Sequence, residues 1–314
     1  MSLTLAEAAK LSQDDLQRGV LETFVVESPV LDRIPFLTIQ GNAYAYNEEA
    51  TLPGVEFRAV NNGYSESTGT VNPKSEKLVI LGGDADVDRF IVQTRGNLND
   101  QRAIQTRMKV KAAAYKFQDH FINGDTAVET NGFDGLKKRL TGNQVFATGA
   151  NGMGPVEGGQ DFFDALDELV ARVPGLNGSN GAFYTNRQIR AKLWSSARRL
   201  GGMDMITEAL TGKPVYTYQG IPLLDIGQTT TGADIIPMAE SQGTSNAAGS
   251  IYAVKFGTAE GDQAVTGLTN GGVQVRDLGE LDTKPVFRTR LEFYTGLAIF
   301  GGKGAARLTG VLNS

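Results

Sequence analysis

The stretch that decides the fold is RGNLNDQRAIQTRMKVKAAAYKFQDHFI, residues 95–122. It predicts one long, unbroken helix, because from Asn99 onward it contains neither glycine nor proline and Asn99-Asp100 offers an N-terminal cap. Apolar and small side chains recur in it at helical spacing, at Ala103, Val110, Ala114, Phe117 and Phe121. We expect this stripe to face the core.

A basic series runs along the same stretch, since Arg95, Arg102, Lys109 and Lys116 recur every seven residues. Seven residues are close to two helical turns, so those members that are helical share roughly one face. Two interpretations are open: a solvated or salt-bridged face, or a basic track that meets a polyanion or an acidic neighbour.

Directly before this helix, residues 36–81 are extended sequence studded with glycine, asparagine and proline. Between positions 42 and 74 there is too little aliphatic sequence for an independent core, yet aromatic side chains are spaced along it, at Tyr44, Tyr46, Phe57 and Tyr64. Long loops without secondary structure are uncommon in compact domains and are usually functional. We therefore expect a partner to order this loop.

The first 35 residues predict an amphipathic arm. Capping patterns begin at Thr4 and Ser12, and one apolar face follows, formed by Leu16, Val20, Leu21, Phe24 and Val25. Ser28-Pro29 ends the helical pattern. The apolar face must be covered either by the chain's own body or by another subunit.

The block 142–265 predicts a second lobe of mixed helix and strand. Helical patterns cover residues 161–173 and the stretch that Asn186 caps, while strands are expected at 182–185, at 250–257 and on both sides of Gln219-Gly220. The chain then ends in strands, because Phe287, Thr289, Leu291 and Phe293 alternate with Val286, Arg288, Arg290 and Glu292. We expect these final strands, including residues 306–312, to pack on the long helix.

Composition excludes several classes of protein. The 314 residues include no cysteine and one histidine, which rules out disulfides, thiolate metal sites and multi-histidine zinc sites. A net charge of -5 argues against a dedicated nucleic-acid binder. No run approaches the ~18–20 apolar residues of a membrane span, and the first ten residues lack a signal-peptide pattern.

No motif supports catalysis, a cofactor or a metal. His120 lies inside the predicted helix, where a structural role is favoured. Asp84, Asp86 and Asp88 alternate like the start of a calcium loop, but Arg89 replaces the required glycine, so we expect three carboxylates on one exposed strand face. The glycine-rich stretch 301–304 lacks the remainder of a phosphate loop.

Five stretches resemble, in order, the major capsid proteins of tailed bacteriophages: LSQDDLQRGVLETFVVESPVLDRIPF, LPGVEFRAVNNGYSESTG, VNPKSEKLVILGGDADVDRFIVQTRGN, NDQRAIQTRMKVKAAAYKFQDHFINGD and FDGLKKRL. The terminal stretch FRTRLEFYTGLAIFGGKGAARLTGV is similar to the last strands of that family. The resemblance implies an α+β chain with the Hong Kong 97-like capsid fold. Residues 1–35 would be the N-terminal arm, 36–81 the extended loop and its base, 82–141 and 266–314 the peripheral domain with its spine helix, and 142–265 the axial domain.

The implied function is that of a major capsid protein, which assembles as pentamers and hexamers into an icosahedral shell around packaged double-stranded DNA. The implied partners are further copies of the chain, a separate scaffolding protein, a portal and a decoration protein, with DNA met only non-specifically on the inner face and no membrane. The shell would be the virion's, assembled in the host cytoplasm. An encapsulin-type compartment around cargo enzymes is the alternative, and a soluble enzyme is a remote one.

In such a shell the arm and the loop would be covered by neighbouring subunits, and the basic series would meet acidic groups there. The residues expected at these contacts are Leu16, Phe24, Tyr44, Tyr46, Phe57, Arg58, Tyr64, Lys74, Arg102 and Lys109. Some relatives join a loop lysine covalently to an asparagine of a neighbour. Lys74 and Lys77 lie at the base of the loop, so we do not predict this cross-link.

Overall fold

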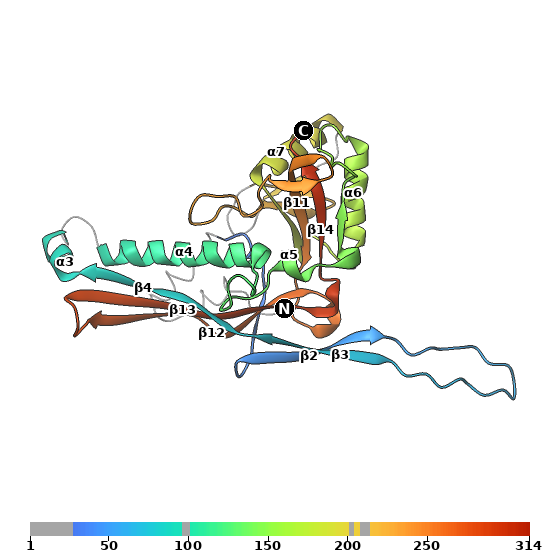
Figure 1. Cartoon of the computed structure of the whole chain (residues 1–314), viewed down its shortest axis with the longest axis horizontal. Coiled ribbons are helices and arrows are strands. Elements are labelled where there is room, and N and C mark those ends of the chain that lie inside the picture. Colours follow the sequence, from blue (N-terminus) through green and yellow to red (C-terminus); the bar gives the residue numbers. More distant parts are fainter. Residues whose placement is uncertain (1–27, 96–100, 201–203, 208–213) are drawn as a thin grey trace.

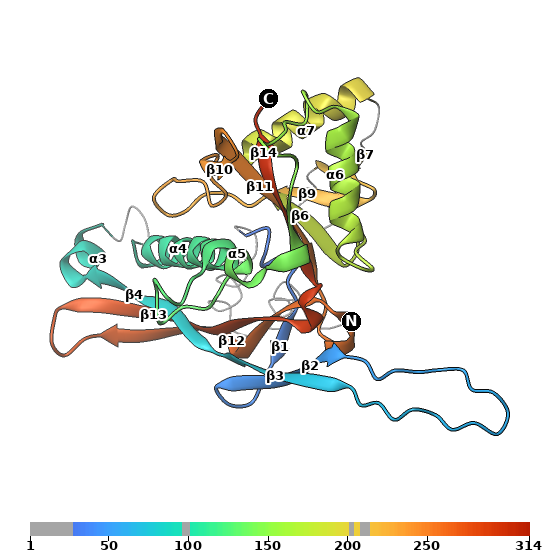
Figure 2. The ribbon, with the colours of Figure 1, turned by 45° about the vertical axis from the view of Figure 1, so that its right-hand side comes forward.

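The computed structural model describes residues 28–95, 101–200, 204–207 and 214–314. The predicted arm helix, with Leu16 and Phe24, lies outside these residues, as does the Asn99-Asp100 cap. The chain forms a long platform of sheet and helix, an upright lobe at one end of it, and a hairpin that projects beyond both (Figures 1 and 2).

The platform is a four-stranded sheet covered on one face by the long helix α4 (Gln101–Asn123). Its strand order is β1 (Phe36–Thr38), β12 (Val265–Glu280), β13 (Val286–Ile299) and β4 (Val79–Asp88). The predicted helix therefore forms, but Arg95 ends a separate short helix, α3 (Arg89–Arg95).

The apolar stripe of α4 is confirmed for Val110, Ala114, Phe117 and Phe121, all of which are fully buried. It is wrong for Ala103, which is exposed. Ala103 lies in the first turn of α4, and the first buried residue of the helix is Thr106. The first turn of α4 therefore does not pack on the core.

The charged strand face is confirmed, because β4 and β13 carry matching charges in register. Asp84 is paired with Arg290 and Asp86 with Arg288, and each arginine donates two hydrogen bonds to its carboxylate, at 2.6–2.9 Å. The arginines hold the pKa of both carboxyls below the usual range. Asp88 instead accepts a hydrogen bond from the Phe90 backbone amide, 2.7 Å.

The upright lobe is built on a second sheet, in the order β5 (Val145–Ala147), β14 (Ala305–Leu312), β11 (Ser245–Lys255), β6 (Gly181–Thr185), β9 (Ile221–Asp225), β8 (Pro214–Tyr218) and β7 (Asp204–Thr207), with β10 (Glu240–Gln242) beside β11. Helices α6 (Gln160–Ala171) and α7 (Arg187–Leu200) belong to the same lobe, where α6 contacts β14 and α7 contacts β9. The strand β6 is buried throughout, as predicted.

Local details of this lobe confirm the sequence patterns. Asn186 caps α7, since its side-chain oxygen accepts a hydrogen bond from the Gln188 amide at 2.7 Å. Gln219 and Gly220 both have positive φ, 50° and 75°, which is what a two-residue turn between antiparallel strands requires.

The prediction for the last strand is wrong. We expected residues 306–312 to lie with the final strands on the long helix, but β14 is in the second sheet, antiparallel to β11 and parallel to β5. Its side chains Ala306, Leu308 and Val311 fill the core of the upright lobe, between the sheet and α6. The chain therefore passes from the platform to the upright lobe after β13.

One apolar core joins the platform to the upright lobe. It includes Phe117 and Phe121 of α4, Phe293 of β13 and Tyr184 of β6, and the Phe121 and Tyr184 rings meet edge to face at 6.1 Å. Shared burial of this kind favours one cooperative body over two independent domains.

Candidate assembly surface

Among the described residues, the projecting hairpin extends furthest from the two lobes (Figure 1). Strands β2 (Ala43–Thr51) and β3 (Thr70–Lys77) pair from Ala43↔Lys77 to Thr51↔Thr70. Beyond them, residues 52–69 form a long loop that extends away from both lobes (Figure 1).

Aromatic packing fixes the base of the hairpin to the body. The Tyr46 ring meets Phe300 edge to face at 5.1 Å and its hydroxyl donates to the Ile299 carbonyl at 3.1 Å. Tyr44 stacks on Tyr46 and donates to a Glu260 carboxylate oxygen at 2.6 Å, a bond that raises the pKa of Tyr44 to about 12.

This packing corrects the prediction for Tyr46 as an inter-subunit contact. Its side chain is only 5% exposed in the isolated subunit, and burial raises its pKa to about 12. The sequence pattern showed an aromatic residue on an extended segment, but it did not reveal Phe300, which lies more than 250 positions away. Tyr46 is an anchor of the hairpin.

The tip of the hairpin is different, because its large apolar side chains project into solvent. Phe57 is fully exposed and Tyr64 is 67% exposed, and Leu52, Val55 and Val60 are exposed as well. Several large apolar side chains exposed within one short segment are typical of an interaction site. The tip residues Phe57, Arg58 and Tyr64 stay predictions as inter-subunit contacts.

The tip nevertheless has local order. Asn61 adopts a positive φ of 73° at the turn. The Arg58 guanidinium lies over the Tyr64 ring at 5.3 Å and donates to the Asn62 carbonyl at 3.2 Å. Across the two legs, the Ser65 amide donates to a Glu56 carboxylate oxygen at 2.6 Å. The exposed side chains are therefore presented on a defined turn.

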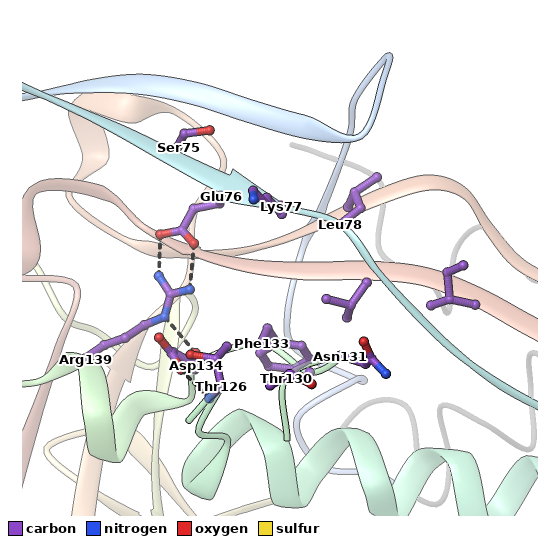
Figure 3. A pocket seen from close by; sticks show the side chains of 13 residues that line it. Ser75, Glu76, Lys77, Leu78, Thr126, Thr130, Asn131, Phe133, Asp134 and Arg139 are labelled. Atoms are coloured by element: carbon purple, nitrogen blue, oxygen red, sulfur yellow. Dashed lines mark hydrogen bonds and ion pairs between the residues drawn. The ribbon is translucent and has the colours of Figure 1, made fainter. Parts of the chain in front are cut away.

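The base of the hairpin also carries ion pairs within the subunit. Lys74, an expected contact residue, lies 2.6 Å from Glu48 on the paired strand. Arg139 of the short helix α5 (Leu136–Arg139) clamps both carboxylate oxygens of Glu76, as Figure 3 shows. No sequence pattern predicts this second pair, since its members are 63 positions apart.

The basic series on α4 is largely salt-bridged inside the subunit. Arg102 lies 2.5 Å from Asp277 and lowers the pKa of that carboxyl, and Lys116 lies 2.8 Å from Glu129. The stem of Lys109 lies close to Gly83, where its charge contributes, after those of the β13 arginines, to the lowered pKa of Asp84. An inter-subunit role for Arg102 and Lys109 stays a prediction.

His120 has the surroundings of a structural residue. Its Nε2 lies 3.0 Å from Glu129, its ring meets Phe133 edge to face at 5.9 Å, and its Nδ1 is buried. Among the residues that the structure describes, no three histidine, cysteine or acidic side chains are grouped as metal ligands. None of the helices in the described ranges is long and apolar enough to cross a membrane.

Comparison with known proteins agrees with this architecture. Residues 12–154 match the model of the family described as major capsid protein GP7. No curated protein sequence matches the chain. Among solved structures, the chain is similar to the holo-SrpI encapsulin complex from Synechococcus elongatus PCC 7942, with 19% identity, a TM-score of 0.67 and coverage of 100% of this chain and 98% of that chain.

Two further solved structures are similar to this chain over nearly their whole length. The capsid of the native GTA particle has 15% identity and a TM-score of 0.63, with 91% of this chain and 90% of that chain covered. A chain of Microbacterium phage Oxtober96 has 14% identity and a TM-score of 0.58, with 91% of each chain covered. The chain has the Hong Kong 97-like capsid fold.

Proposed function

We propose that this chain is the major capsid protein of a tailed phage, which assembles as pentamers and hexamers into an icosahedral shell around double-stranded DNA. The observation that carries the proposal is the hairpin tip, with its ordered but solvent-exposed apolar side chains. The capsid fold and the match of residues 12–154 to a major capsid protein family support it.

The physical basis is repeated weak association. Each subunit contributes the same surfaces to a closed ring, and once one contact has formed the next is effectively intramolecular. The partners proposed are other copies of the chain, a separate scaffolding protein, a portal and a decoration protein, with DNA contacted non-specifically. The subunit has no catalytic role in this proposal, and assembly takes place in the host cytoplasm.

The test is removal of the tip. Residues 52–69 are replaced by Asn-Gly, which closes the hairpin directly after the Thr51↔Thr70 pair with a two-residue turn. Electron microscopy should show shells for the full chain and none for the variant, while circular dichroism and thermal unfolding of the dispersed subunits stay alike. A full chain that remains monomeric at high concentration in every salt and scaffold condition would contradict the proposal.

An encapsulin-type shell around cargo enzymes is the second candidate, and the similarity to the encapsulin complex favours it. The two functions differ in the content of the particle. Shells purified from the native source should contain nuclease-protected DNA if the chain is a phage capsid protein, and a co-purifying folded enzyme without DNA if it is an encapsulin.

A further inference from the structure

The turn of the hairpin tip contains an asparagine that is followed by a glycine, Asn62-Gly63. Both residues are exposed, on a loop that extends away from both lobes (Figure 1). In an Asn-Gly pair the backbone nitrogen of the glycine can attack the side-chain amide carbon of the asparagine, because glycine has no Cβ that would hinder the approach. The function proposed above does not use this pair.

The sequence alone does not distinguish this pair from the others in the chain. Asparagine precedes glycine at seven positions, namely Asn62, Asn123, Asn131, Asn151, Asn177, Asn180 and Asn270. The attack requires a side-chain amide that is free to turn toward the backbone and a glycine nitrogen that is free of other bonds. Hydrogen bonds of either group therefore decide which pair reacts, because they must break before the reaction.

At three of the pairs the glycine nitrogen is already in a hydrogen bond. The amides of Gly124, Gly132 and Gly152 each donate to the backbone carbonyl three or four residues earlier, at 2.9–3.3 Å. Asn123 is held on its side chain as well, because its Nδ2 donates to the Ile235 carbonyl at 2.7 Å. The nucleophile of these three pairs becomes available only when the local structure opens.

At three further pairs the asparagine side chain is held. Asn177 Oδ1 accepts a hydrogen bond from the Asn180 backbone amide at 3.1 Å, and Asn180 Nδ2 donates to the Gly175 carbonyl at 2.9 Å. Asn270 Nδ2 donates to the Gly41 carbonyl at 3.5 Å, a longer bond than the other two. Among these six pairs, we therefore expect Asn270 to react first.

Asn62-Gly63 is held at neither position. Within the residues that the structure describes, the Asn62 side chain makes no hydrogen bond and the Gly63 amide donates none. The turn itself is ordered, because the Asn62 amide donates to the Ala59 carbonyl and Arg58 donates to the Asn62 carbonyl, both at 3.2 Å. An added Cβ on Gly63 would meet nothing within 4 Å, so the space around the reacting nitrogen is open.

We propose that Asn62-Gly63 is a site of spontaneous deamidation, which modifies the hairpin tip in the free subunit. The Gly63 nitrogen loses its proton, forms a bond to Asn62 Cγ and displaces ammonia, and water then opens the resulting succinimide ring. Opening at Cγ gives aspartate, and opening at the former backbone carbonyl carbon gives isoaspartate. The reaction needs only water, so it does not depend on the proposed capsid function.

Either product changes the surface that the tip presents. The tip carries two glutamates and one arginine, and conversion of the amide to a carboxylate adds one negative charge. In the isoaspartate product the main chain runs through the former side chain, and the former Asn62 carbonyl becomes a carboxylate. That oxygen is the group to which the Arg58 guanidinium donates at 3.2 Å in the unmodified turn, so the product gains an ion pair.

The test compares all seven pairs within one chain. The full chain is incubated at mildly alkaline pH, and mass spectrometry of proteolytic peptides measures the mass gain at each asparagine over time. Asn62 should convert at least about fivefold faster than any other asparagine, the factor that one ordinary hydrogen bond gives. In chemical denaturant, where these hydrogen bonds are absent, the lead of Asn62 should disappear.

Gly63→Ala is the matched control, because its methyl group hinders the reacting nitrogen while the open space leaves the fold unchanged. It should slow conversion at Asn62 severalfold and leave the other six rates unchanged. Equal rates at the seven pairs of the folded chain, or a faster rate at any other pair, would overturn the proposal. A lead of Asn62 that persists in denaturant, or a rate that Gly63→Ala does not change, would overturn it as well.

Discussion

Replacing Phe57 with serine should weaken assembly without affecting the subunit. The side chain is fully exposed in the isolated chain, so its removal costs the folded subunit nothing in packing. If a neighbour buries it, the loss per contact is about 2 kcal/mol, which lowers the association constant about 30-fold. Because each subunit contributes one tip, the concentration needed for shell formation should rise by a similar factor, measured by sedimentation of a dilution series.

The control for this prediction is Phe90→Ser, which removes an exposed aromatic side chain of α3 and should leave the threshold concentration unchanged. Thermal unfolding of the dispersed subunits should give the same Tm for both variants and the parent chain. Assembly of Phe57→Ser at the parent concentration would refute the reasoning, because it would mean that no neighbour buries Phe57. A lowered Tm would refute it as well, because it would mean that Phe57 packs within its own subunit.

Three further predictions concern the subunit. Gly82→Ala should destabilise it by about 1–3 kcal/mol, because an added Cβ would lie 2.2 Å from the Leu291 carbonyl oxygen; Gly63→Ala, where nothing lies within 4 Å, is the neutral control in chemical denaturation. The hydrogen bond from Arg288 lowers the folded-state pKa of Asp86, so the ion pair stabilises the folded subunit above about pH 4, and this stabilisation is lost as the pH falls through the folded-state pKa. Asp86→Asn removes the titrating group and should make Tm depend less on pH below pH 4. Arg139→Met leaves the half-buried carboxylate of Glu76 without its cation, so the free energy of unfolding should fall by about 3 kcal/mol in the same denaturation assay.

Local patterns predicted much of the platform correctly. Alternation along residues 286–293 correctly predicts that Thr289, Leu291 and Phe293 are buried, whereas Phe287 is only partly buried. The spacing of Val110, Ala114, Phe117 and Phe121 correctly predicts the buried face of α4. Such periodicities report which face of an element is buried. They do not report which strand lies next to it. For that reason the prediction that β14 lies with the platform strands on the long helix is wrong.

The candidate site was predicted only in part, for a similar reason. The shortage of aliphatic residues in the loop indicated that it lacks a core of its own, and the exposed tip agrees with that prediction. The anchoring of Tyr46 and the Arg139–Glu76 ion pair depend on contacts between residues that are far apart in sequence. No periodicity within one segment carries information about such contacts.

The anchored base and unsupported tip make the hairpin a lever. Its last firm attachment is Tyr46, packed on Phe300, and about 14 residues of extended chain between there and the turn span on the order of 45 Å. A rotation of only about 5° at that attachment would displace the tip by roughly 4 Å over this length. In the proposed shell, one subunit structure would therefore meet neighbours at the different angles of five-membered and six-membered rings by a small adjustment of the Tyr46 and Phe300 rings, while the core stays unchanged.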